Sequence, residues 1–191
     1  KLALNASGGK HGGLGLTVAT MQLGVGALYA LLVWIVGYNF VPVSGLKPPT
    51  KQAPPKTSAS DFAKMIPVAF CSAAAHSSSV LALNAGSVSF GQIVKAAEPA
   101  FSAVVNTIIY GKSPSLAKWM VLPFIIAGVA FACLKPNPLG GYTIEFDTTA
   151  LTMASIANLF AAFKGSENHK LMAAPGLKER INGVGNQFAL T

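Results

Sequence analysis

The chain has 191 residues, of which 52% are hydrophobic and 10% are charged, and its formal net charge is +8 at pH 7. An average soluble domain carries roughly 25% charged residues, so this composition excludes an ordinary soluble protein and indicates an integral membrane protein. Nucleic-acid binding is also disfavoured, because the basic residues are scattered singly and form no patch interleaved with aromatic residues.

Five apolar segments are predicted to cross the membrane as helices, a crossing that takes about 20 residues. Residues 38–60, rich in proline, lysine and serine, are predicted to form a loop outside the membrane. A partial sixth span is expected from about residue 181, in a sequence that we expect to be cut at both ends. The chain 1–191 is thus predicted to be a single transmembrane helical domain. The predicted spans are 14–37, 62–83, 87–111, 117–134 and 148–163.

The positions of lysine and arginine favour five spans, because alternate loops lie on opposite faces and basic residues prefer the cytoplasm-like face. With five spans, only Lys1, Lys10 and Lys135 lie on one face, and Lys95 lies within the membrane. An error in the number of spans would mix the two sets. The opposite, lysine-rich face holds Lys47, Lys51, Lys56, Lys64, Lys112, Lys118, Lys164, Lys170, Lys178 and Arg180.

The second and third spans carry ionisable residues at the depth of the bilayer centre. Only a few residues around Asn84 join these spans, so they are predicted to form an antiparallel helical hairpin. His76 lies about nine residues before the turn and Lys95 about ten after it, so each lies roughly 14–15 Å below the surface. A lysine at this depth costs about 2.5–3.5 kcal/mol on insertion scales, and therefore normally lines a cavity or has a partner.

Polar residues recur at helical spacing on both helices of this hairpin and are predicted to face a common interior. Glu98 lies three residues after Lys95, so an anion site and a purely structural ion pair both remain open. Pro99 is predicted to kink the third span, since it lacks a backbone donor. The two polar sets are Ser72, His76 and Ser79, and Gln92, Lys95, Ser102 and Asn106.

The sequence predicts no enzyme, no metal site and no cofactor. His11, His76 and His169 belong to different spans or loops, and Cys71 and Cys133 have no ligand spacing. The serines beside His76 have no carboxylate nearby in sequence that would orient a catalytic imidazole.

The run SFGQIVKAAEPAFSAV at 89–104 resembles the signature SFT-H-T-IKALEPFF of the plastid triose-phosphate/phosphate translocators, within the drug/metabolite transporter superfamily. The run DFAKMIPVAFCSAAAHSSSV resembles that family's third span, and TALTMASIANLFAAF resembles its sixth. The resemblance implies an all-α membrane fold of ten spans in two inverted five-helix repeats around a midplane site. This chain would hold spans two to six and the start of the seventh, about half of the family's protein.

The resemblance also implies a function: an antiporter in a plastid (chloroplast) membrane that exchanges triose phosphate, or a related phosphorylated C3 to C6 metabolite, for inorganic phosphate by alternating access. His76, Ser79 and Lys95 match positions that line the family's substrate site, with Lys95 on the phosphate group. Gln92 and Glu98 are expected to be supporting polar residues. The expected partners are phosphorylated metabolites, inorganic phosphate and membrane lipids.

Two other functions remain open. Gly91 and Gln92 stand where the family has threonine and histidine, which favours a translocator-like structural subunit without transport activity in a larger membrane complex, for example a photosynthetic one. The other alternative is a carrier of the same superfamily for nucleotide sugars.

Overall fold

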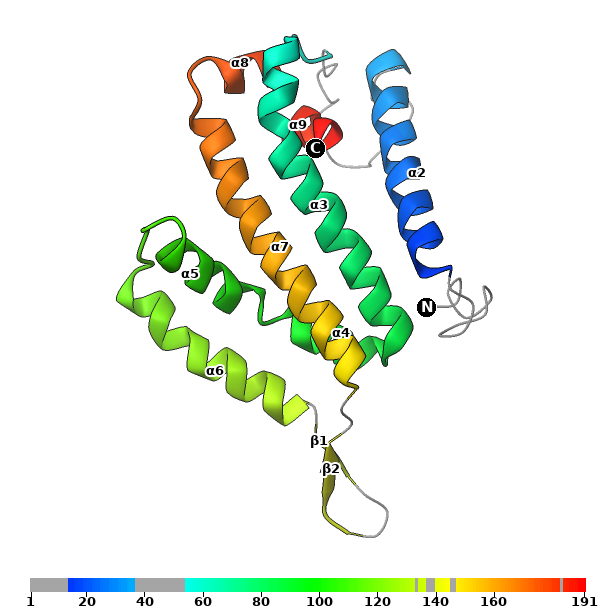
Figure 1. Cartoon of the computed structure of the whole chain (residues 1–191), viewed down its shortest axis with the longest axis vertical. Coiled ribbons are helices and arrows are strands. Elements are labelled where there is room, and N and C mark those ends of the chain that lie inside the picture. The colour runs from blue at the N-terminus through cyan, green and yellow to red at the C-terminus, as the bar shows by residue number, and fades with distance from the viewer. Residues whose placement is uncertain (1–13, 37–53, 133, 137–139, 145–146, 183) are drawn as a thin grey trace, which may run out of the picture.

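The computed structural model describes residues 14–36, 54–132, 134–136, 140–144, 147–182 and 184–191. These residues form helices and one short β-hairpin (Figure 1), which confirms the predicted all-α class apart from the hairpin. In chain order the elements are α2 (Gly15–Val36), α3 (Ala59–Ala85), α4 (Val88–Lys95), α5 (Glu98–Ile108), α6 (Leu116–Ala132), β1 (Leu134–Pro136), β2 (Tyr142–Ile144), α7 (Thr148–Ala173), α8 (Leu177–Ile181) and α9 (Val184–Leu190).

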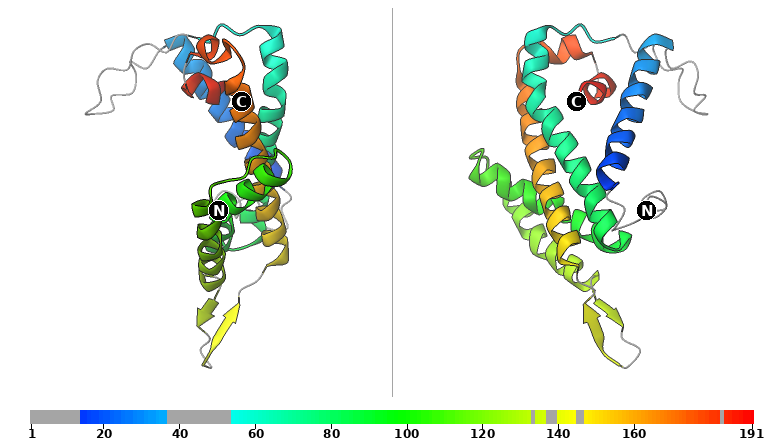
Figure 2. Two further views of the ribbon diagram at one scale, coloured as in Figure 1. Left: turned by 90° about the vertical axis from the view of Figure 1, so that its left-hand side faces the viewer. Right: turned by 45° about the vertical axis from the view of Figure 1, so that its right-hand side comes forward.

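The centre of the bundle is the antiparallel pair of α3 and α7, which lie side by side along most of their length (Figures 1 and 2). Ser58 and Asp61 begin α3 with a capping box, in which each side chain accepts a hydrogen bond from the other's backbone N–H. Helices in lipid gain little from burying apolar surface, so they associate through close packing. Small side chains allow this packing, because they let the two backbones approach each other. The buried alanines of α7 are Ala150, Ala154, Ala157 and Ala162.

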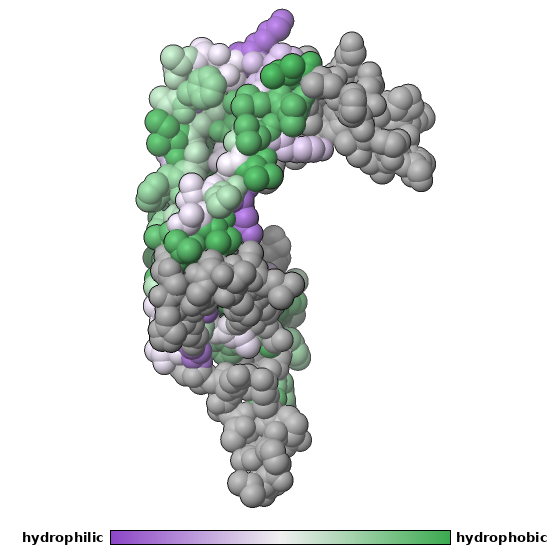
Figure 3. All heavy atoms as spheres, turned by 90° about the vertical axis from the view of Figure 1, so that its right-hand side faces the viewer, coloured by the Kyte–Doolittle hydropathy of each residue, from purple (hydrophilic) through white to green (hydrophobic). Residues whose placement is uncertain are grey.

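Helix α2 leans against α3 through Ala19, which is buried with Val80. Elsewhere α2 exposes large apolar side chains, among them Met21 and Ile35, and hydrophobic residues gather on this side of the molecule (Figure 3). By length and composition, α2 and α3 are the two helices in the described part of the chain that could each span a bilayer. Such a surface suits contact with lipid or with further helices.

The third predicted span is two helices, α4 and α5, which meet at Ala96 and Ala97 and differ in direction (Figure 1). Pro99 lies in the first turn of α5 and has no N–H to donate to the carbonyl of Lys95. The kink predicted from this proline is therefore present, and it is a complete break.

The remaining links differ from the sequence predictions. After α6, β1 pairs antiparallel with β2, with Leu134 opposite Ile144, and this hairpin projects beyond the helices (Figures 1 and 2). Helix α7 continues ten residues past the predicted end of its span at 163. The predicted loop 38–60 lies largely outside the described residues, and α3 already begins at Ala59.

Two short helices, α8 and α9, lie where the partial span is expected from about residue 181, and that span stays a prediction. Leu177 and Ile181 of α8 are fully buried against Met65 and Val68 of α3. The end of α7 and the start of α3 are therefore held together by an apolar cluster.

Candidate functional site

A cavity of about 440 Å3 lies where α3, α7 and the break between α4 and α5 meet. It contains polar groups from α3, α4, α5 and α7, and Leu23 of α2 also lines it. We call it the central cavity. Its polar lining residues are Ser72, His76, Ser79, Lys95, Glu98, Lys164 and Asn168.

The polar set predicted on α3 lines the central cavity as a group, because the i, i+4, i+7 spacing places it on one helix face. His76 Nε2 lies 3.1 Å from Oε1 of Gln22 on α2. This amide oxygen can only accept, so Nε2 carries the proton in this contact. The hydroxyl of Ser79 donates to the carbonyl of Ala75 at 2.8 Å, and its oxygen remains able to accept.

Lys95 is the last residue of α4 and Glu98 is the first residue of α5, so the two residues lie on opposite sides of the break between these helices. Each charge suits its helix end: a cation at a C-terminus and an anion at an N-terminus. The ion pairs within 4.0 Å in the described part of the chain are Lys170–Glu167 and Arg180–Asp61. A structural pair between Lys95 and Glu98 is therefore not formed.

Lys164 is a second amine in the central cavity, and sequence analysis placed it outside the membrane on the lysine-rich face. The predicted span ends at 163, whereas helix α7 continues to Ala173. A signal was present in the sequence. Ala157, Ala161, Lys164 and Asn168 follow helical spacing i, i+4, i+7, i+11, and all four line the cavity.

Asn158 of α7 forms a hydrogen bond to the end of α4, next to the central cavity. It is fully buried on α7, and its Nδ2 donates to the backbone carbonyl of Val94 at 2.8 Å. In an unbroken α-helix the N–H of Glu98 would donate to this carbonyl. Here the carbonyl accepts from the N–H of Ala97 at 3.1 Å, and the amide of Asn158 is a second donor at the point where the helix is interrupted. Oδ1 of Asn158 has no hydrogen-bond partner among the described residues. The residue immediately after Val94 is Lys95, so this contact holds the backbone next to Lys95.

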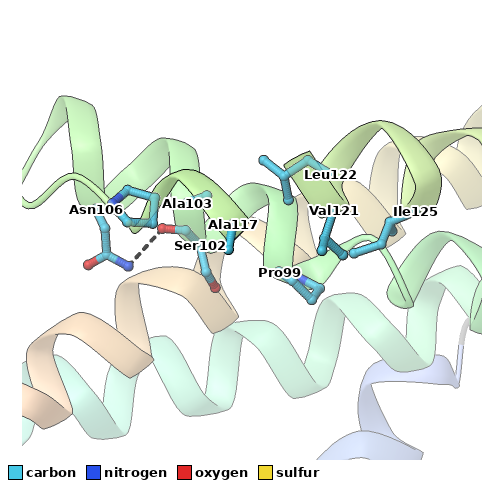
Figure 4. Close-up of a pocket in the computed structure, with 9 residues that line it drawn as sticks. Pro99, Ser102, Ala103, Asn106, Ala117, Val121, Leu122 and Ile125 are labelled. Carbon is cyan, nitrogen blue, oxygen red and sulfur yellow. Dashed lines mark hydrogen bonds between the residues drawn. The ribbon is translucent and has the colours of Figure 1, made fainter. Parts of the chain in front are cut away.

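The predicted polar stripe of the third span does not continue across the break. Gln92 is exposed and does not line the central cavity. Ser102 and Asn106 lie on α5 and line two other cavities, one of them shown in Figure 4. Helical spacing was extended through residues 96 and 97, where the backbone changes direction, and this part of the prediction is wrong.

An ion pair holds the end of the bundle beyond the central cavity. Nε and Nη2 of Arg180 donate to the two carboxylate oxygens of Asp61 at 3.0 and 2.8 Å. The side chain of Asp61 is 1% exposed, and its hydrogen bond raises the pKa of Arg180 above the usual value. This bidentate contact fastens α8 to the first turn of α3.

Metal binding finds no support in the described residues, where no group of three histidine, cysteine, aspartate or glutamate side chains could hold an ion. Two amines and an imidazole instead line one cavity between the helices of a membrane protein, an arrangement that suits an anionic solute.

The family described as "Triose-phosphate Transporter family" has a model that matches residues 1–191, so the chain belongs to this family. It is similar to the chloroplastic triose phosphate/phosphate translocators of Solanum tuberosum, at 31% identity over 81% of this chain and 33% of that protein, and of Pisum sativum, at 30% identity over 81% and 34%. It also resembles the chloroplastic glucose-6-phosphate/phosphate translocator 1 of Arabidopsis thaliana, at 27% identity over 81% and 34%.

The chain thus spans about a third of the length of the curated relatives it matches, against the half that we expected. The family resemblance, the integral membrane class and the plastid location predicted from the sequence are confirmed.

Proposed function

We propose that the protein containing this chain exchanges triose phosphate, or a related phosphorylated C3 to C6 metabolite, for inorganic phosphate across a plastid membrane. The names of the relatives support phosphate and sugar phosphates as the kind of substrate. One structural observation carries the proposal: Lys95, which is exposed, and Lys164, which is half-buried, line one cavity, and neither has a carboxylate within 4.0 Å among the described residues.

The chemistry of the central cavity suits a phosphate dianion. Its two amines and the carboxylate of Glu98 leave a net charge of +1 when His76 is neutral (+2 − 1). Phosphate oxygens accept charge-assisted hydrogen bonds that replace the water lost on entering the membrane. We assign the phosphate group to Lys95 and Lys164, with His76 and Ser79 as further hydrogen-bond partners.

Transport by this site needs no covalent step. The two repeats of the full-length protein would rock around the occupied cavity, exposing it to each face in turn. An empty cavity lined by two amines is costly to move through the membrane, which would make exchange obligatory. The break between α4 and α5 lies beside Lys95, where Pro99 has no N–H to donate.

The test is phosphate exchange by the full-length protein reconstituted in liposomes, with Lys95→Gln and Lys164→Gln beside the wild type. Each substitution removes a charge-assisted hydrogen bond, so we expect exchange at low phosphate to fall roughly 10- to 100-fold. Lys178→Gln is the matched control, because this exposed lysine of α8 lies away from the cavity.

Unchanged exchange in both cavity variants would remove the proposed role of the two amines. A wild-type protein that exchanges no phosphate would favour the structural-subunit alternative. Competition by triose phosphate, glucose 6-phosphate and a nucleotide sugar separates the substrate classes, and only the phosphorylated sugars are expected to compete.

A further inference from the structure

Two cavities outside the central one meet on α5, and they differ sharply in chemistry. The first, of about 470 Å3, lies between α5 and α6 (Figure 4) and is lined mainly by apolar residues, among them Pro99, Ala117, Val121, Leu122 and Ile125. We call it the apolar slot. The second, of about 190 Å3, lies between α5 and α7, and we call it the basic cavity. Its basic and phenolic lining residues are Tyr110, Lys112, His169 and Lys170.

The two cavities share Ser102 and Asn106, so they are adjacent parts of one hollow. Asn106 Nδ2 donates to the carbonyl of Ser102 at 2.7 Å, as drawn in Figure 4. Asn106 Oδ1 accepts from the hydroxyl of Ser166 on α7 at 2.9 Å. This fixed amide marks the boundary between the apolar and the charged part.

The basic cavity retains positive charge after its internal contacts are counted. Glu167 accepts hydrogen bonds from the hydroxyl of Tyr110 at 2.5 Å and from Nζ of Lys170 at 3.1 Å. The same Nζ lies 4.2 Å from the centroid of the Tyr110 ring. Lys170 is therefore largely neutralised, whereas Lys112 has no ion pair within 4.0 Å in the described part of the chain.

The location of the hollow matches the layers of a membrane. Lys112 follows the end of α5, and Lys170 lies in the last turn of α7, both on the predicted lysine-rich face. The apolar slot extends along α6 from Ala117 to Ile125, which is about 12 Å of helix. A ligand in this hollow would have its charge at the interface and its apolar part within the hydrocarbon layer.

We propose that the slot and the basic cavity together bind an anionic phospholipid, with its phosphate beside Lys112 and one acyl chain between α5 and α6. The positive cavity selects an anionic headgroup over a zwitterionic one. A soluble phosphate would satisfy only the basic cavity and would leave the slot unfilled. Helices α5 and α6 make few direct contacts, so the lipid would connect them. This structural role is separate from substrate exchange.

The experiment uses the full-length protein in detergent, titrated with phosphatidylglycerol or with phosphatidylcholine of the same acyl chains. Bound lipid is counted by native mass spectrometry, and the unfolding temperature is measured in parallel. We expect phosphatidylglycerol to bind and to raise the unfolding temperature, and phosphatidylcholine to do neither at the same concentration.

Two variants separate the parts of the site. Lys112→Gln removes the unpaired charge and is expected to weaken phosphatidylglycerol binding about fivefold, whereas Lys178→Gln, a lysine outside the hollow, is expected to leave it unchanged. Ala117→Phe narrows the slot and is expected to abolish binding while the basic cavity stays intact. Equal binding of both lipids, equal stabilisation by inorganic phosphate alone, or unchanged binding in Lys112→Gln would each overturn the proposal.

Discussion

Gly86, at the turn between α3 and α4, is the position where one added methyl group should be most harmful. A Cβ at this residue would lie 2.6 Å from Cβ of Ala150 on α7, whereas ordinary contacts are 3.4–4 Å. Ala150 is fully buried, and φ at Gly86 is −114°, which any residue can adopt. The penalty therefore comes from packing alone, and overpacking of this kind typically costs about 1–3 kcal/mol.

The assay is thermal unfolding of the full-length protein in detergent. We expect Gly86→Ala to lower the unfolding temperature by several degrees, and Gly24→Ala, where an added Cβ meets nothing within 4 Å, to leave it unchanged or slightly raised. Ala150→Gly should rescue Gly86→Ala, because it removes the other half of the clash. An unchanged unfolding temperature in Gly86→Ala, or additive effects in the double variant, would refute the packing argument.

Two further substitutions test contacts that connect distant segments. Asn158→Leu removes the hydrogen bond to Val94 and also the buried Oδ1, which has no partner among the described residues. Because such hydrogen bonds contribute about 0.6 kcal/mol within membranes, the unfolding temperature should hardly change. The KM for phosphate exchange should rise, because Lys95 is held less firmly. An unchanged KM would contradict this positioning role. Asp61→Asn removes the charge that holds Arg180, so trypsin should cleave after Arg180 faster than in the wild type; equal rates would show that α8 is held by its apolar contacts alone.

Local sequence patterns were sufficient for features that neighbouring residues decide. The apolar segment of α2 and a kink at Pro99 depend on composition and on one missing N–H, so both were predictable. The spacing of Ser72, His76 and Ser79 likewise predicted the face that they share, because a single continuous helix carries them.

The same patterns failed where a distant segment changes the local outcome. The predicted fifth span ends before Lys164, and the cavity that this amine lines is completed by residues of α3, α4 and α5, which are distant in the chain. Spacing was carried from Gln92 to Asn106 through the break, where it no longer holds. The hydrogen bond from Asn158 to Val94 joins residues that are 64 positions apart, and nothing near either residue indicates it.

By itself, the sequence determined a helical membrane protein and its family, and it predicted a lysine and a histidine at one depth in the bilayer, because hydrophobicity and helical periodicity act through neighbouring residues. The tertiary structure alone decided which polar side chains share a cavity. Lys164 lines the central cavity together with Lys95, whereas Ser102 and Asn106 line the other two cavities. The physical reason is that the surroundings of an amine depend on which helices pack around it, and that packing is set by contacts between segments far apart in the chain.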